Sequence, residues 1–171
     1  MTRRMNRPPL ALALGLLLAG CGLHPLYGGG GGGRVASMLG HIEVAPIEGK
    51  AGWLVSNAVR DQLGADRGTS PTYRLEVRLD DKVTGLGVRG DDTITRERRT
   101  LRARYQLIDL ANGAVLLDAT AGSDAGIDVV GSEYATIAAE NTALERLSGT
   151  IASQIVSRIA LYAERTSPAE P

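Results

Sequence analysis

Aromatic side chains are scarce in this chain, and so are residues that bind metals through sulfur or imidazole. The 171 residues include no Phe, one Trp, one Cys and two His. A single cysteine excludes an internal disulfide and a cysteine-based zinc site, and two histidines are too few for a histidine-based metal centre. Because aromatic residues make up only 4%, the core must be built from Leu, Ile, Val and Ala.

Neither sign of charge is in excess: 19 Lys and Arg balance 19 Asp and Glu. Of the 19 basic residues 17 are Arg, which favours planar, fork-shaped contacts with anions over point-charge contacts. No run of about 20 apolar residues follows the N-terminal region, so no membrane-spanning helix is expected there. The length is typical of one domain.

The first 21 residues have the pattern of an export signal. Arg3, Arg4 and Arg7 precede the short apolar run Leu10–Leu18, as in a secretory signal peptide. The run ends in Leu18-Ala19-Gly20-Cys21, which looks like a bacterial lipobox, in which the cysteine is lipidated and becomes the mature N-terminus. The alternatives are an ordinary signal peptide with a chance cysteine, or a buried free cysteine.

Cleavage before Cys21 predicts a mature chain that is anchored by lipid. It removes three Arg and no acid, so 16 basic residues face 19 acidic ones, a net charge of −3. In enterobacterial lipoproteins, Asp directly after the lipidated cysteine retains the protein in the inner membrane. This chain has Gly22 at that position, and by that analogy it is expected at the periplasmic face of the outer membrane. Residues 21–34, with six consecutive glycines, predict a lipidated tether. A domain is expected over 35–165 and a disordered tail over 166–171.

The hydrophobic pattern of the domain predicts the order β-α-β-β-β-α. Alternation and helical spacing give the following elements: strand His41–Ile47, helix Lys50–Leu63, strands Tyr73–Val83, Thr93–Asp109 and Ala114–Ala121, and helix Glu133–Glu164 with Ser132 as its N-cap. This order predicts an α+β two-layer sandwich, a four-stranded mixed sheet with two helices on one face.

The turn Ala111-Asn112-Gly113 allows the register of one hairpin to be predicted. A two-residue loop would place Leu107 opposite Asp118, whereas a three-residue loop with Gly113 at positive φ pairs Leu107 with Leu117. A slip of one residue would invert every side chain, so we predict the three-residue loop. Val115, Leu117, Ala119 and Ala121 are then expected to be in phase.

The last helix carries the strongest pattern in the chain. Its apolar residues lie at three- and four-residue steps and are expected to face the core: Tyr134, Ile137, Ala138, Leu144, Leu147, Ile151, Ile155, Ile159 and Tyr162. At about 48 Å the helix is longer than a small sheet needs, so its surplus offers surface to a partner.

No catalytic constellation is found. Gly85–Gly90 matches G-x-G-x-x-G, but Asp91, Asp92 and a strand follow in place of the helix that would hold a pyrophosphate. We therefore expect a flexible hairpin loop there, no cofactor and no enzyme activity.

A cluster of arginines on one strand face is the candidate binding site. The candidates for contacts with anionic groups such as lipid phosphates are Arg89, Arg96, Arg98, Arg102 and Arg104. In the alternative interpretation the neighbouring strand neutralises them, with Asp80 opposite Arg98 and Glu76 opposite Arg102. Nucleic acid is a poor candidate, because the mature chain is acidic and exported.

The segment Cys21-Gly22-Leu23-His24-Pro25-Leu26-Tyr27-Gly28 resembles the mature start of the LptE family of lipopolysaccharide-assembly lipoproteins, in its alphaproteobacterial form. Leu23 stands where that form has an aromatic residue. The element order, the arginine-rich strand and the long last helix are also similar. The resemblance implies an outer-membrane lipoprotein that plugs the barrel of the partner LptD, helps it to form, and binds lipopolysaccharide without a cofactor. The alternatives are an accessory lipoprotein of a periplasm-spanning lipid transporter, or an enzyme with an unrecognised site.

Overall fold

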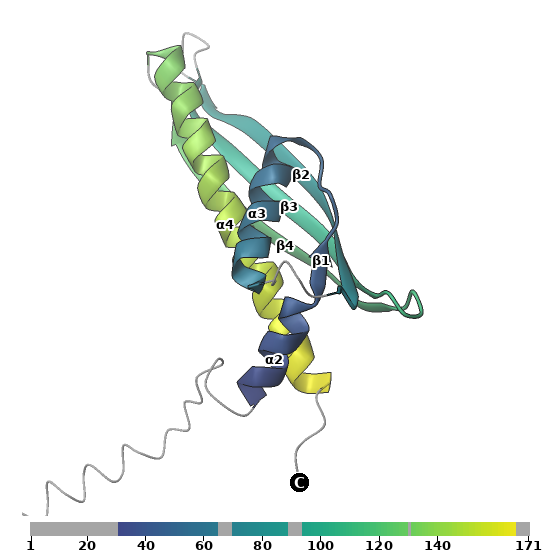
Figure 1. Cartoon of the computed structure of the whole chain (residues 1–171). Coiled ribbons are helices and arrows are strands. Elements are labelled where there is room, and N and C mark those ends of the chain that lie inside the picture. The colour runs from purple at the N-terminus through teal and green to yellow at the C-terminus, as the bar shows by residue number, and fades with distance from the viewer. Residues whose placement is uncertain (1–30, 65–69, 89–93, 130, 167–171) are drawn as a thin grey trace, which may run out of the picture.

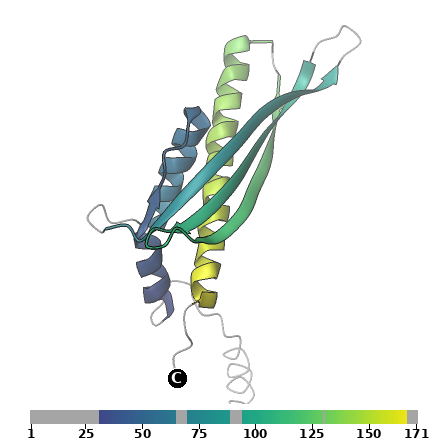
Figure 2. The same ribbon diagram turned by 90° about the vertical axis from the view of Figure 1, so that its right-hand side faces the viewer.

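A four-stranded sheet and three helices make up the described part of the chain (Figure 1). The computed structural model describes residues 31–64, 70–88, 94–129 and 131–166. Its elements are α2 (Gly31–Gly40), β1 (Ile42–Val44), α3 (Gly49–Leu63), β2 (Tyr73–Val88), β3 (Ile94–Asp109), β4 (Val115–Asp128) and α4 (Glu133–Thr166). The predicted α+β class is confirmed, with a mixed sheet and both α3 and α4 on one of its faces (Figure 2).

The strands lie in the order β1-β2-β3-β4. The short strand β1 pairs parallel with the start of β2, from Ile42 opposite Tyr73 to Val44 opposite Leu75. Strands β2 and β3 pair antiparallel from Tyr73 opposite Asp109 to Val88 opposite Ile94, without a bulge. This long ribbon extends well beyond β1 (Figure 2).

The predicted pairing of Leu107 with Leu117 is confirmed, but the loop between β3 and β4 has four residues, 110–113, where three were predicted. The Asp109 N–H donates to the Ala114 carbonyl (2.9 Å), and the Gly113 N–H donates to the Asp109 carbonyl (2.8 Å). Gly113 has φ 72°, which glycine adopts without strain.

A register shift next to Leu107 places Val115 opposite Ile108, so Leu116 is the extra residue of a bulge. Val115 is therefore out of phase with Leu117 and is 52% exposed, contrary to the predicted phase.

Three strands differ in length from the prediction. Strand β1 covers three residues only, because Pro46 follows soon after it and cannot donate to a sheet ladder. Strand β2 continues through Gly85 to Val88, where a flexible loop was expected. Strand β4 continues beyond Ala121 to Asp128.

The helix boundaries follow local capping. Helix α3 ends before Gly64, which has φ 61° in the left-handed region, and Ser132 Oγ accepts a hydrogen bond from the Ala135 N–H (3.4 Å) at the start of α4. Helix α2 was not expected; it begins inside the segment predicted to be a tether. Its buried side chains Val35 and Leu39 explain why it packs beside the C-terminal end of α4 (Figure 1).

The core lies between the sheet and the helices. The helix-facing side chains of β3 are buried as predicted, and so is the central part of the α4 stripe. The first turns of α4 are not: Tyr134 is 84% exposed and Ile137 48% exposed. These two residues and Ala138, which is also exposed, were expected in the core. The helix extends past the apolar part of the sheet, as its surplus length suggested.

The helix-facing side of the sheet becomes polar at its far end. Arg99 lies there with only 12% of its side chain exposed. Its Nε and Nη2 donate to the two oxygens of Asp81 (2.9 and 2.6 Å), and Nη1 donates to the Glu140 carbonyl of α4 (3.0 Å). Arg99 therefore joins the long ribbon to the N-terminal half of α4.

Candidate arginine site on the open sheet face

The face of the sheet opposite the helices carries the predicted arginines. Leu101, Ala103 and Tyr105 of β3 are buried towards the helices, so the residues between them face outwards. The outward set on β3 contains Arg96, Arg98, Arg102 and Arg104, which we call the arginine face. Arg89 and Cys21 lie outside the described residues, so their expected roles stay predictions.

Aspartates of β4 neutralise most of the arginine face. The closest atoms of each ion pair are 3.0–3.4 Å apart, and the pairs are Arg96 with Asp128 (3.1 Å), Arg102 with Asp124 (3.4 Å) and Arg104 with Asp118 (3.0 Å). These pairs are largely exposed to solvent, which screens the charges, so each contributes little to stability. In the alternative interpretation a neighbouring strand neutralises the arginines, and the structure shows such neutralisation for these three.

The predicted partners on β2 are wrong. Asp80 lies opposite Arg102, not Arg98, and Glu76 lies opposite Gln106, not Arg102. Both pairs are displaced by four residues. The correct carboxylates come from β4, and two of them, Asp124 and Asp128, lie in the part of that strand beyond its predicted end.

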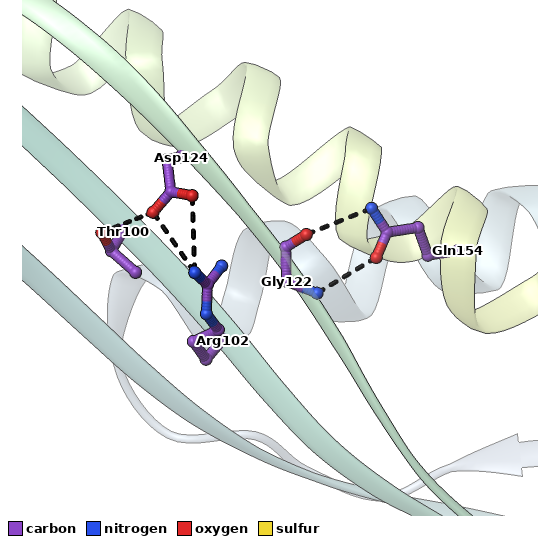
Figure 3. Close-up of polar contacts among 5 residues, drawn as sticks. All are labelled: Thr100, Arg102, Gly122, Asp124 and Gln154. Atoms are coloured by element: carbon purple, nitrogen blue, oxygen red, sulfur yellow. Dashed lines mark hydrogen bonds and ion pairs between the residues drawn. The ribbon is translucent and has the colours of Figure 1, made fainter.

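Neutral donors reinforce two of the pairs. The Asp118 carboxylate accepts hydrogen bonds from Arg104 and from Gln106 Nε2 (2.9 Å), which hold its pKa below the usual range. The Asp124 carboxylate accepts a hydrogen bond from Thr100 Oγ1 (2.6 Å); this bond and the charge of Arg102 lower its pKa (Figure 3). Both aspartates are therefore held in the charged form that arginine requires.

Two guanidinium groups on this face have no hydrogen bond or ion pair within the described ranges. One is Arg98, which lies between Thr84 and Gly126 in the sheet. The other is Arg78 of β2, which lies directly opposite Arg104. Two like charges in this arrangement repel each other. Arg78 was not among the predicted site residues, although the alternation of β2 already placed it on the outward side.

A shallow depression of about 770 Å³ lies over the middle of the face, with Arg78, Arg102 and Arg104 along it. Gly122 forms part of its floor. A Cβ there would come within 2.6 Å of Arg102 Nη1, so the glycine lets that side chain lie flat on β4. At the edge of β4, Gln154 of α4 bonds the Gly122 N–H and carbonyl (Figure 3).

The chemistry of this depression suits an anion with several oxygens. A guanidinium offers two parallel donors that match a phosphate or carboxylate. Across residues 31–64, 70–88, 94–129 and 131–166 no group of three or more His, Cys, Asp or Glu side chains could hold a metal ion.

The family model "LptE: Lipopolysaccharide-assembly" matches residues 39–159, which is more than half of the chain. The chain belongs to the LptE family. No curated protein matches this LptE-family chain by sequence.

Solved structures of bacterial lipoproteins have the same fold. A lipoprotein from Caulobacter crescentus is 25% identical, with a TM-score of 0.65, over 78% of this chain and 98% of that one. A minor lipoprotein from Acinetobacter baumannii is 16% identical, with a TM-score of 0.57, over 77% and 97%. Rare lipoprotein B from Shewanella oneidensis is 8% identical, with a TM-score of 0.55, over 70% and 93%.

The chain is therefore a member of a lipopolysaccharide-assembly family and shares its fold with these bacterial lipoproteins. None of the helices described here is both long and apolar enough to cross a bilayer.

Proposed function

We propose that this chain is a non-enzymatic outer-membrane lipoprotein that is anchored through Cys21, plugs and helps to assemble the LptD barrel, and binds lipopolysaccharide on its way to the cell surface. Membership of the LptE family, over residues 39–159, carries this proposal. The export signal and lipobox at the N-terminus support the location, because a lipidated cysteine holds a chain at a membrane without a spanning helix.

The arginine face supports the lipopolysaccharide part of the proposal. Lipopolysaccharide carries phosphate groups on sugars, and arginine forks are suited to them. Arg98 and the depression beside Arg102 and Arg104 are open to solvent. Arg96 extends the candidate set along β3 beyond Arg98, and Arg89 stays a candidate from the sequence alone.

The binding test replaces Arg98 and Arg102 together by Glu in the full chain. We expect weaker binding of purified lipopolysaccharide, with the far-UV circular dichroism and unfolding midpoint close to those of the native chain. Arg146→Glu/Arg165→Glu is the matched control, because it makes the same charge change of −4 at two exposed positions of α4, away from the arginine face. Equal binding by all three proteins would contradict a role for the arginine face.

The partner test is affinity purification from detergent-solubilised envelopes. We expect an outer-membrane β-barrel protein to co-purify, and mass spectrometry of the chain to show an acylated Cys21 as the first residue. Recovery of inner-membrane transporter subunits in place of a barrel would favour an accessory lipoprotein of a lipid transporter and contradict the plug.

A further inference from the structure

Two rows of outward side chains cross the middle of the open sheet face, with one residue from each of three strands. Each row runs from β2 through β3 to β4, and the residues are Arg78, Arg104 and Thr120 in the first row and Asp80, Arg102 and Gly122 in the second. All of them line the depression of about 770 Å³. Neighbouring strands are about 5 Å apart, so the three strands can contact one small ligand together.

The second row is neutralised within the chain. The Arg102 side chain lies over Gly122, with Nη2 3.4 Å from Asp124 Oδ2 (Figure 3). On β2, Asp80 Oδ2 is 2.9 Å from Lys82 Nζ. Each charge of this row therefore already has a partner of opposite sign, and an anion gains less from it than from an unpaired guanidinium.

The first row carries positive charge that the described residues do not neutralise. Arg104 donates to the Asp118 carboxylate through Nε and Nη2 (3.3 and 3.0 Å), and its Nη1 makes no hydrogen bond within those residues. The Arg78 guanidinium has no partner there either, and in this antiparallel ladder its Cα lies about 4.5–5.5 Å from that of Arg104. The two guanidinium groups repel each other, and an anion between them would remove that repulsion.

The neutral groups beside this arginine pair suit hydroxyl groups. Thr120 stands at the β4 end of the first row, and its Oγ1 makes no hydrogen bond within the part of the chain that the structure describes. Gln154 of α4 lines the same side of the depression and holds the Gly122 backbone. The depression is larger than one phosphate or carboxylate needs, and its volume falls in the range of about 300–1,000 Å³ that is usual for small-molecule sites.

We propose that Arg78 and Arg104 together hold one oxyanion, a phosphate or a carboxylate, that is carried by a sugar, and that this sugar lies across the depression with a hydroxyl group bonded to Thr120. Guanidinium groups match both kinds of oxyanion with paired donors. The inference rests on the proposed function for the whole ligand, a glycolipid of which this sugar is one residue. Arg98, further along β3, is then free to bind another charge of the same ligand.

Isothermal titration calorimetry of the full chain in detergent tests the ligand class. The probes are glucose 1-phosphate, glucuronate, glucose and inorganic phosphate. We expect at least one charged sugar to bind at least tenfold more tightly than both glucose and inorganic phosphate, because only the charged sugars offer the oxyanion and the hydroxyl groups together. The charged sugar that binds more tightly identifies the oxyanion. If neither charged sugar binds, or if inorganic phosphate binds as tightly as both, the proposal is overturned.

Substitutions test the two ends of the first row. Arg78→Gln should weaken binding of the charged sugar at least tenfold without lowering the unfolding midpoint, because it also removes the repulsion with Arg104. Thr120→Val keeps the shape of the side chain and should weaken that binding about threefold, while binding of inorganic phosphate stays unchanged. Arg146→Gln is the matched control on the exposed side of α4 and should bind as the native chain does. Binding by Arg78→Gln within twofold of the native chain overturns the proposal.

These outcomes are separate from those of the proposed function. If the charged sugars do not bind but the chain still binds lipopolysaccharide and co-purifies with a barrel, only the sugar subsite is wrong. If the charged sugars bind as expected to a chain that has neither of those properties, the subsite is supported and the proposed function is wrong.

Discussion

Arg99 is the position where a single substitution should test the joint between the β2–β3 ribbon and α4. We consider Arg99→Met, which keeps much of the aliphatic stem and removes the guanidinium. The change removes three hydrogen bonds, two to Asp81 and one to the Glu140 carbonyl. It leaves the Asp81 carboxylate, only 23% exposed, without its cation.

The expected cost lies between two limits. Breaking a fully buried ion pair costs about 3–5 kcal/mol, whereas an exposed pair is worth about 0–1 kcal/mol. With 12% and 23% of the two side chains exposed, the pair lies between them, so we expect a loss of about 2–3 kcal/mol. For a domain of this size that lowers the unfolding midpoint by roughly 10 °C.

Urea unfolding followed by circular dichroism measures this loss, with a constant m-value as the check that the native and unfolded states are unchanged. A cycle with Asp81→Asn isolates the pair, and we expect a coupling energy of about 2 kcal/mol. A loss below about 0.5 kcal/mol for Arg99→Met, as for an ordinary surface residue, would refute the reasoning.

Four further substitutions have expected outcomes. Gly52→Ala places a Cβ 2.5 Å from the Ile47 carbonyl oxygen and should destabilise by about 2 kcal/mol, whereas Gly149→Ala meets nothing within 4 Å and should stabilise by about 0.5–1 kcal/mol; thermal unfolding compares them. Burial and the neighbouring Glu140 raise the pKa of Glu97, so the stability that its protonated form contributes is lost as pH rises through that pKa. Glu97→Gln should therefore be more stable than the native chain at neutral pH and equally stable in acid. A stability difference that stays constant across a pH series of unfolding curves would contradict this. Asp124→Asn removes the carboxylate that pairs with Arg102 while keeping a side chain of nearly the same shape, and it should tighten lipopolysaccharide binding roughly two- to fivefold. Unchanged binding in a titration would mean that Arg102 does not contact the ligand.

The sequence predicted which side of each strand faces the core better than it predicted strand partners. Alternation has a period of two, so any even displacement of β2 against β3 preserves the same faces. The expected pairing of Asp80 with Arg98 was off by four residues, and Arg98 lies opposite Thr84. The pairing of Leu107 with Leu117 was predictable because Leu107 needs an apolar residue opposite it. The loop length was not: the loop has four residues, 110–113, and the bulge at Leu116 restores the predicted register.

The end of β4 could not be predicted because its residues give a weak strand signal. Gly122, Ser123 and Gly126 have low strand propensity, and pairing with β3, together with the hydrogen bonds between Gln154 and Gly122, holds them extended. Helix α2 was missed for a related reason. Its first residues are glycines, which disfavour an isolated helix, and the buried contacts of Val35 and Leu39 provide what local propensity lacks.

The aspartates of β4 determine how the arginine face can work. A row of arginines without counter-charges would attract any anion, but Asp118, Asp124 and Asp128 already occupy three of them. An anion must displace those carboxylates or bind at Arg98 or Arg78, which form no ion pair within the described residues. A phosphorylated glycolipid that offers several phosphates over a wide area can do both at once, whereas a single free phosphate gains little from an arginine that is already neutralised. The arginine face therefore favours a large ligand with several charges over small anions.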